Sequence, residues 1–263
     1  MGQYFMWLNP IKGEYIEPFD FDQGSKRRES AWVGSAILDS LYTLMANDWK
    51  GDPIVWIGDY VELNNEKNST LMITEKICGP SPYEYANLHF KDVSCQFSNC
   101  SKKDVVEGVF HKEVLMTYGM SEDEINHYFV KCRSYDEPCE SPLYECEPPS
   151  LEWDFQDYIQ YMIAYLENKG MFSRKAEKFH LLINDTKKEF VDFRPIISES
   201  EKKYNPFPVL MIKENNSKDP TNDLASEYCG IWLGDTIRVS NDVCEVPTNY
   251  MDASNKYSWE EDI

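Results

Sequence analysis

The sequence predicts an α+β fold, in which two related β-rich halves flank a mainly helical insert. Short motifs recur near the two ends of the chain, and the middle of the chain carries apolar residues at helical spacing. At 263 residues, with 42% hydrophobic and 14% aromatic residues, the chain has the length and composition to bury a core. We expect a first half at 1–77, an insert at 78–177, a second half at 178–246 and an acidic tail at 247–263.

Each half is expected to begin with a β-hairpin. The strings LNPIKGEYIEPF and INDTKKEFVDFR share the pattern Asn-x-x-Lys-x-Glu-aromatic-β-branched-acid. The apolar stretches QYFMWL and KFHLLI precede the two turns, and the returning strands alternate apolar and acidic residues. This alternation predicts strands with one face buried and one face in solvent.

A Trp-x-Gly-Asp string follows in each half, within IVWIGDY and GIWLGDT. Asn184 lies 184 − 9 = 175 residues after Asn9, and Trp232 lies 232 − 56 = 176 residues after Trp56. We interpret the nearly equal offsets as an internal duplication. Both tryptophans are expected to be buried in equivalent, central strands, and the glycine of each string to mark a bulge or a close approach.

Helices are expected once in the first half and repeatedly in the insert. SAWVGSAILDSLYTLMAND has an apolar stripe at helical spacing. In the insert, KKDVVEGVFHKEVLMTYG ends on Gly119, SEDEINHYFVKC opens with a Ser121/Glu124 capping box, and SLEWDFQDYIQYMIAYLENKG is amphipathic. The prolines of DEPCESPLYECEPPS exclude a regular element there.

The charge of the chain is strongly negative, at −20 from 26 basic and 46 acidic residues. Residues 1–77 contribute 7 − 12 = −5, residues 78–177 contribute 9 − 18 = −9, and residues 178–263 contribute 10 − 16 = −6. Such a field repels nucleic acid and anionic membranes and favours a basic protein partner. An acidic surface that serves only solubility is the alternative explanation.

The location of the protein is predicted from what the sequence lacks. MGQYFMWLNP has no basic start followed by an apolar stretch, and no apolar run approaches the roughly 18 residues of a membrane span. We therefore expect a cytoplasmic protein whose eight cysteines are reduced thiols.

The strings MGQYFMWLNPIKGEYI, DQGSKRRESAWVG and IVWIGDY resemble a set of uncharacterised bacterial and bacteriophage proteins. Those chains open with Met-Gly-Gln-Tyr and carry a hairpin VN-x-x-K-K-E-Y, a G-x-K-x-x-E string and a W-x-G-D strand. The likeness covers mainly residues 1–62, with Gly24, Lys26 and Glu29 at the G-x-K-x-x-E positions. It implies a fold module and a phage or bacterial setting, without an established activity.

A small-ligand site is one hypothesis for the motif residues. Lys26, Glu29 and Asp59 would lie in a cleft between the halves, with Asp235 and Arg238 as their relatives in the second half. A strand-end Asp can bind a metal or act as a base, and a nearby Lys can bind phosphate, as in a small enzyme or nucleotide-binding protein. In the alternative interpretation, Asp59 caps a turn and the Lys–Glu pair is solvated.

No cofactor is expected, although two groups of residues leave zinc binding open. These groups are His89, Cys95 and Cys100, and Cys132, Cys139 and Cys146. Neither group has the two closely spaced cysteine pairs that make a zinc site specific.

An acidic stretch within the insert is the candidate docking surface. Eight acids and no Lys or Arg lie between Asp136 and Asp157, with aromatic residues among them. Carboxylates steer a basic partner and aromatics anchor it, so this composition suits a basic protein groove; a solvated acidic connector is the alternative. The expected partner-binding residues are Asp136, Glu137, Glu140, Tyr144, Glu145, Glu147, Glu152, Trp153 and Asp154.

The function predicted from these features is that of a non-catalytic binding protein of phage or mobile-element type. It would bind and inhibit a nucleic-acid-handling or host-defence enzyme, in an anti-defence or immunity role.

Overall fold

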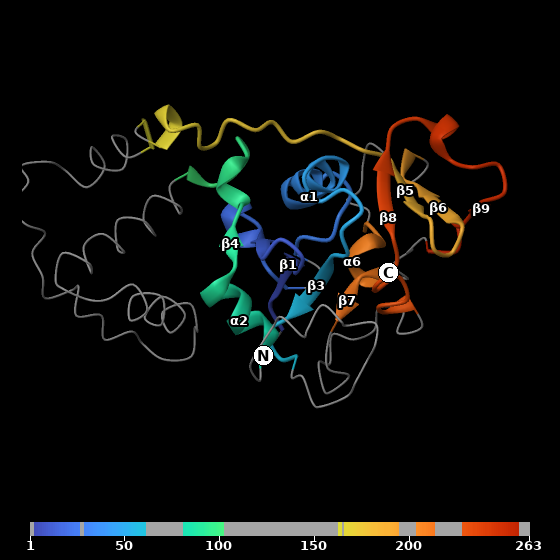
Figure 1. Cartoon of the computed structure of the whole chain (residues 1–263), viewed down its shortest axis with the longest axis horizontal. Coiled ribbons are helices and arrows are strands. Elements are labelled where there is room, and N and C mark those ends of the chain that lie inside the picture. The colour runs from blue at the N-terminus through green and yellow to red at the C-terminus, as the bar shows by residue number, and fades with distance from the viewer. Residues whose placement is uncertain are drawn as a thin grey trace, which may run out of the picture.

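The computed structural model describes residues 3–26, 29–61, 81–102, 163–164, 166–194, 204–213 and 228–257. Within these residues the chain forms two β-sheets, with strand orders β4-β2-β1-β3-β7 and β8-β5-β6-β9, accompanied by a few helices (Figure 1). The predicted α+β class is therefore confirmed.

The first sheet is built on the first predicted hairpin. β1 (Phe5–Asn9) pairs antiparallel with β2 (Glu14–Ile16) and, along its other edge, with β3 (Val55–Gly58). β4 (Lys91–Asp92) adds parallel to β2, and β7 (Ile212–Lys213) adds parallel to β3. β3 thus has a strand on each side, as its apolar sequence predicts.

The second sheet repeats this pairing pattern. β5 (Leu181–Asn184) pairs antiparallel with β6 (Glu189–Asp192) and with β8 (Ile237–Ser240), and β9 (Met251–Asp252) adds parallel to β6. The order β9-β6-β5-β8 therefore matches β4-β2-β1-β3 in both sequence order and strand direction. Both predicted hairpins are confirmed.

The helix predicted in the first half is α1 (Ala36–Ala46). It begins later than the apolar pattern suggested, because Ser35 is the N-cap and its hydroxyl oxygen accepts a hydrogen bond from Leu38 N–H at 3.4 Å. Trp32 lies before the helix and forms an isolated bridge with Tyr204. The other described helical elements are η1 (Pro18–Phe21), α2 (Pro82–His89), η3 (Ser94–Gln96), α6 (Phe207–Leu210) and η7 (Val243–Glu245).

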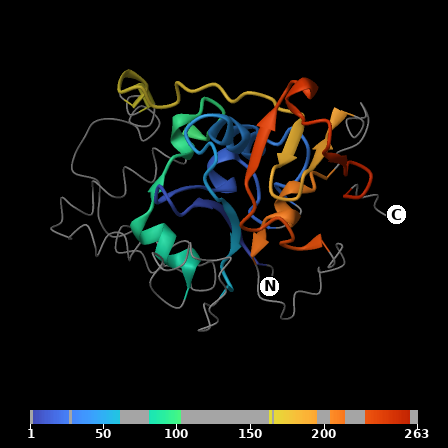
Figure 2. The ribbon, with the colours of Figure 1, turned by 45° about the vertical axis from the view of Figure 1, so that its right-hand side comes forward.

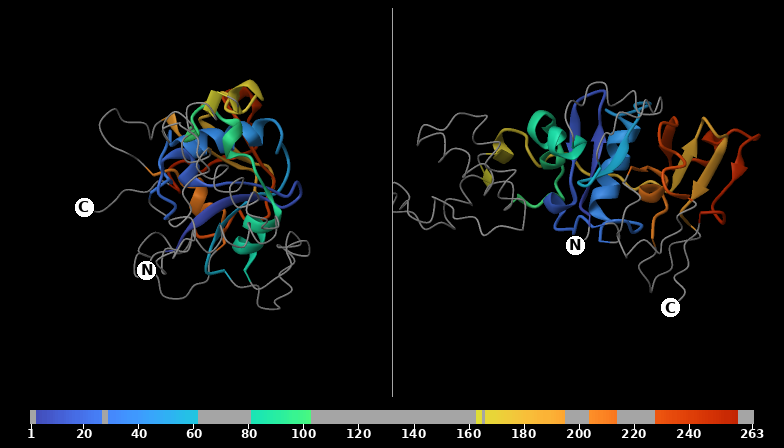
Figure 3. Two further views of the ribbon diagram at one scale, coloured as in Figure 1. Left: turned by 90° about the vertical axis from the view of Figure 1, so that its left-hand side faces the viewer. Right: turned by 90° about the horizontal axis from the view of Figure 1, so that it is seen from below.

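One main core joins the two sheets. Trp7 and Trp56 of the first sheet and Leu182 of the second belong to a single buried cluster, to which α1 contributes its apolar face. The right-hand view of Figure 3 shows α1 beside both sheets. Its most extensive contact with a strand is with β8. Met6 and Leu8 point to the opposite face of β1, where they form a smaller core with Ala86 of α2. The alternation along β1 thus buries both faces of this strand.

The segment leading into β5 crosses the molecule as an extended strap (Figures 1 and 2). Arg174 bonds to the backbone at Gln96 and Ser98 and forms an ion pair with Asp48. Glu177 N–H donates to Thr43 Oγ1 of α1 at 2.7 Å. The strap therefore ties the first-half elements to the start of the second sheet.

Two strands lie outside the predicted halves. β4 is in the predicted insert and pairs with β2, and β9 is in the predicted tail and pairs with β6. Residues 103–162, which carry most of the predicted insert and its helices, are outside the described residues. In the part of the chain that is described, no helix combines the length and apolar character of a membrane span.

Candidate functional site

The tryptophans of the two predicted strings do not occupy equivalent strands. Both are fully buried, as predicted. Trp56 lies in β3, however, whereas Trp232 lies in a turn that precedes β8. Gly230 and Gly234 have φ of +69° and +84°, and such left-handed positions end extended structure. The predicted equivalence of these two strands is therefore wrong.

The counterpart of Trp232 is Trp49, in a third Trp-x-Gly-Asp string that the sequence analysis did not use. Trp49 Nε1–H donates to the Glu14 carboxylate at 2.7 Å, and Trp232 Nε1–H donates to the Glu189 carboxylate at 2.7 Å. Glu14 and Glu189 are the glutamates of the two Asn-x-x-Lys-x-Glu hairpins. Each indole thus bonds to the same hairpin position.

The aspartates of these strings bond to the hairpins as well. Asn9 Nδ2 donates to Asp52 at 2.9 Å, and Asn184 Nδ2 donates to Asp235 at 2.8 Å. The Oδ1 atom of each asparagine also accepts hydrogen bonding from backbone N–H of its own turn. In the second hairpin the donor is Lys187 N–H, at 2.9 Å. The shared motif residues are therefore parts of a structural framework.

The backbone follows the same correspondence. Gly51 and Gly234 have φ of +77° and +84°, and the hairpin positions Gly13 and Lys188 have φ of +63° and +58°. The offset is 232 − 49 = 183 for the tryptophans and 184 − 9 = 175 for the asparagines, so the second copy is eight residues longer between the two motifs.

Asp235 and Arg238 are therefore not relatives of Asp59. Asp235 bonds to Asn184 and pairs with Lys187 Nζ at 3.3 Å. Arg238 donates to Asp185 at 2.8 Å and to the Glu245 carbonyl oxygen at 3.0 Å. Both side chains are engaged within the second sheet and its turns.

Lys26, Glu29 and Asp59 lie around the start of β1, with Asp59 on the other side of the strand from Lys26 and Glu29. Tyr4 forms an isolated bridge with Lys26, and Tyr4 N–H donates to Asp59 Oδ1 at 3.1 Å. Lys26 N–H donates to Glu29 Oε2 at 3.1 Å, and Glu29 N–H donates back to the Lys26 carbonyl oxygen at 2.9 Å. The carboxylates thus accept backbone bonds at a turn and a loop, in agreement with the turn-capping interpretation of Asp59.

Asp59 is nevertheless electrostatically unusual. Burial raises its pKa to about 6, although backbone N–H bonds lower the pKa, and the nearby Glu84 carboxylate adds to the rise. A carboxyl group with this pKa can exchange a proton near neutral pH.

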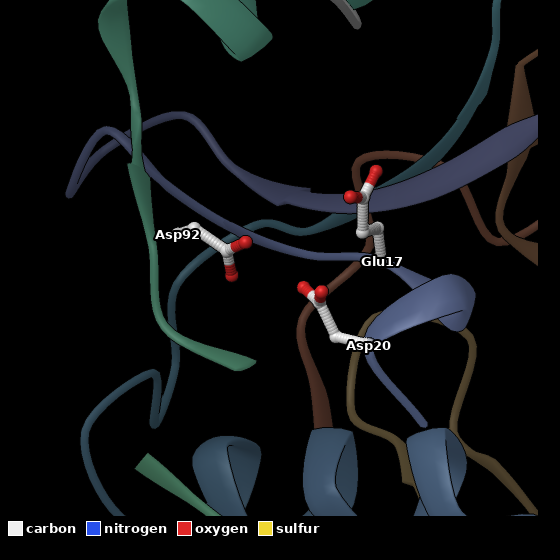
Figure 4. A group of neighbouring side chains, drawn as sticks. All are labelled: Glu17, Asp20 and Asp92. Carbon is white, nitrogen blue, oxygen red and sulfur yellow. The ribbon is translucent and has the colours of Figure 1, made fainter. Parts of the chain in front are cut away.

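A group of carboxylates that the sequence analysis missed lies beside β2. Glu17, Asp20 and Asp92 place carboxylate oxygens within 4.8 Å of one another, and Figure 4 shows Asp20 of η1 and Asp92 of β4 facing each other, with Glu17 alongside. Oxygen donors of this kind suit a divalent cation. At the corresponding place in the second sheet, the guanidinium of Arg194 bonds to Asp192.

The predicted zinc groups gain no support from the described residues. His89, Cys95 and Cys100 do not form a metal-ligand group there, and Cys132, Cys139 and Cys146 lie outside the described residues. Burial and the Asp92 and Asp20 carboxylates raise the pKa of Cys95 to about 12, which keeps its thiol protonated.

Cys95 and Cys244 are free thiols in this structure, and the reduced state expected of all eight cysteines stays a prediction.

The predicted docking residues, from Asp136 to Asp154, lie outside the described residues, so the docking surface stays a prediction.

Comparison of the chain with protein-family models, with curated proteins and with solved structures finds no match. Its function has to be inferred from its own residues.

Proposed function

We propose that the chain is a non-catalytic binding protein that docks on a basic protein partner and inhibits it. The observation that carries this proposal is the negative charge of −20, with a net excess of acids in each of the three predicted parts. A field of one sign attracts an oppositely charged partner and accelerates its association.

We also infer that the two sheets descend from one duplicated module interrupted by the insert. The matching order of four strands supports this inference, as do the matching Asn–Asp and Trp–Glu hydrogen bonds. Under this inference, the Asn-x-x-Lys-x-Glu and Trp-x-Gly-Asp residues are shared because they hold the module together.

The engagement of the motif residues favours binding over catalysis. Asp235 and Arg238 are bonded to neighbouring side chains, and Glu29 and Asp59 accept backbone hydrogen bonds. A catalytic acid or base needs to reach a substrate proton. These side chains are instead used to fix turns and loops.

The acidic stretch 136–157 is the proposed docking site. Its eight carboxylates imitate the charge spacing of a nucleic-acid backbone, and the aromatic side chains of Tyr144 and Trp153 would anchor the contact. A nucleic-acid-handling or host-defence enzyme has the basic groove that such a surface fits. The proposed biological role is anti-defence or immunity in a phage or mobile element, the setting that the sequence resemblance implies.

The test compares two charge-reversed variants of the full chain with the unaltered protein. One variant reverses Asp136, Glu137 and Glu140 to Lys within the docking site. The control reverses exposed acids elsewhere, by the substitutions Asp22→Lys, Glu84→Lys and Glu177→Lys. Far-UV circular dichroism confirms that each variant is folded.

Candidate partners are first captured from host lysate and then purified, and association is measured at low and high salt. Reversal in the docking site should slow association about tenfold or more at low salt and much less at high salt, because salt screens steering over about 8–10 Å. The control should change the association rate less. An equal effect of both variants would mean that net charge alone acts, and it would eliminate 136–157 as the docking site.

Truncation of the aromatic anchors tests the same site through dissociation. Trp153→Ala or Tyr144→Ala should speed dissociation and cost on the order of 2 kcal/mol if the residue is a hot spot. Unchanged dissociation in both variants would remove the aromatic residues from the proposed contact.

A further inference from the structure

The start of β1 is a second region of interest, independent of the docking site. Phe5 N–H donates to the Ser25 carbonyl oxygen at 2.9 Å, and Asp59 N–H donates to the Tyr4 carbonyl oxygen at 2.9 Å. The loop of the G-x-K-x-x-E string and the end of β3 therefore flank residues 3–5 on opposite sides. Three separate strings of the sequence meet at this end of the first sheet.

Three buried hydrogen-bond donors at this place have no partner. They are Gln3 Nε2, Ser25 Oγ and Trp56 Nε1, and their residues are 5%, 1% and 0% exposed. An unpaired buried donor costs about 1–3 kcal/mol, so native proteins contain few of them. Three at one end of a sheet call for hydrogen-bond acceptors that the described residues do not supply.

Two of the three donors belong to residues on the strand and the loop that pair with the start of β1, and the third belongs to Gln3, just before β1. The Trp56 ring stacks on the Phe5 ring with a centroid separation of 4.5 Å. Ser25 pairs with Phe5 through its carbonyl oxygen, next to the Tyr4–Lys26 bridge. Gly58 pairs with Phe5 on the other side, and the carboxamide of Gln3 lies over Gly58, where any Cβ would overlap it. Gly58 therefore admits the Gln3 side chain.

The second sheet closes the same end with a different side chain. By strand register, Asn241 occupies the position of Gly58. Its Oδ1 accepts His180 N–H at 3.2 Å, and its Nδ2 donates to the Lys178 carbonyl oxygen at 2.8 Å. Asn241 thus bonds to the backbone at this end of the second sheet, where His180 Nε2 is the buried atom left unpaired. The first sheet has Gly58 in place of Asn241 and three unpaired donors.

We propose that the start of β1 binds a small uncharged molecule through carbonyl oxygens, of the class of amides and pyrimidine bases. An amide, an indole and a hydroxyl group all donate hydrogen bonds, so the occupant has to supply acceptors. Two carboxylates flank the site, since Glu29 lies against Gly24 and Asp59 follows Gly58, and they disfavour an anion.

Indole NMR of the full chain tests this proposal, with uracil as the probe. The Trp56 Nε1–H signal is assigned by loss of one resonance in Trp56→Phe. Uracil should shift that signal saturably, whereas the signals of Trp49 and Trp232 should stay in place because those indoles already bond to carboxylates. Acetate, as the anionic probe, should leave the Trp56 signal unchanged.

Two substitutions locate the binding. Ser25→Ala and Gln3→Met each remove a donor, and each should weaken uracil binding about tenfold, the effect of one lost hydrogen bond. Ile11→Ala, on the exposed first hairpin turn, is the control and should bind uracil unchanged. A Trp56 signal that does not respond to uracil up to its solubility limit overturns the proposal. A Trp56 signal that responds to acetate and not to uracil also overturns the proposal. The proposal is overturned as well if the Trp56 indole is found to bond only to water.

Discussion

Glu189 and Glu14 hold the same position in the two sheets, but their environments differ. Matched substitutions at the two positions should therefore destabilise the fold to different extents. Glu189 is 3% exposed and accepts hydrogen bonds from Trp232 Nε1 at 2.7 Å, Tyr257 OH at 2.9 Å and Lys256 Nζ at 3.5 Å. Glu14 is only partly buried and accepts from Trp49 Nε1 at 2.7 Å. Glu189→Ala should therefore destabilise the fold more than Glu14→Ala.

The magnitudes follow from the number and burial of the bonds. Removal of one hydrogen bond to a charged group costs about 1.5–3 kcal/mol, which is the expectation for Glu14→Ala. Glu189→Ala breaks a buried charged network and leaves the Trp232 indole unpaired, which should cost about 3–5 kcal/mol. Glu189→Gln keeps an oxygen acceptor for Trp232 and should lie between the other two variants.

The assay is urea unfolding of the three variants, followed by tryptophan fluorescence and by circular dichroism. A change in the midpoint at constant slope reports the free energy of unfolding. Equal destabilisation by Glu189→Ala and Glu14→Ala, or a larger effect of Glu14→Ala, would refute the argument that burial and bond number determine the contribution of this position.

Three further predictions concern backbone conformation and pH. Gly51→Ala and Gly234→Ala should each lower the free energy of unfolding by about 1–2 kcal/mol in urea unfolding, because an L residue is strained at φ of +77° and +84°. Lys188→Gly should raise the free energy of unfolding by up to about 1 kcal/mol, because Lys188 has φ of +58°. Burial raises the pKa of Asp39 to about 6 in the folded state, so the stabilisation due to its protonation is complete below about pH 4 and is lost as the pH rises through 6. Asp39→Asn should therefore flatten the loss of stability between pH 4 and pH 7, and part of the loss should remain because the pKa of Asp59 is raised to about 6 as well.

The local features of the fold could be predicted from the sequence. An asparagine-led turn between an apolar and an alternating stretch is a local signal, and both hairpins formed where it predicted them. The first helix was predicted as well, but its start was not, because Ser35 and not the apolar stripe determines where α1 begins. Short parallel strands such as β4 and β9 left no periodic signal, since two residues cannot show an alternation.

The predicted correspondence of Trp56 with Trp232 is wrong because an apolar context does not identify equivalent Trp-x-Gly-Asp strings. Trp56 and Trp232 both have apolar neighbours, whereas Trp49 is in the polar string DWKGDP. What identifies the counterpart is a hydrogen bond from an indole to a hairpin glutamate, which is a contact between distant residues. The equal offset expected of a duplication was also misleading, because the second copy is eight residues longer between its motifs.

The candidate site was predicted only in part for a similar reason. Lys26, Glu29 and Asp59 flank Tyr4 because a loop and a strand end both pair with its backbone, and the strand end was predicted. The carboxylate group of Glu17, Asp20 and Asp92 combines the end of one hairpin with a strand far along the chain. The available signal was the string Asp-x-Ser, which occurs at Asp92 and again at residues 252–254, and in each copy Ser N–H bonds to the Asp carboxylate.

The comparison of the two sheets separates structural residues from candidates for function. Polar residues that make the same bond in both copies, such as Asn9 and Asn184, are explained by the fold alone. Residues that differ at corresponding positions need another explanation, and Gly58 in place of Asn241 is the clearest case. Asn241 bonds to the backbone at its sheet end, whereas Gly58 has no side chain and the Gln3 amide beside it is unpaired. A Gly58→Asn substitution tests this reasoning directly. A side chain at position 58 would displace the Gln3 carboxamide. If Gly58 serves the ligand site, Gly58→Asn should therefore abolish the uracil response of the Trp56 indole while the chain stays folded. A folded Gly58→Asn protein with an unchanged uracil response would show that the difference between the two sheets carries no function.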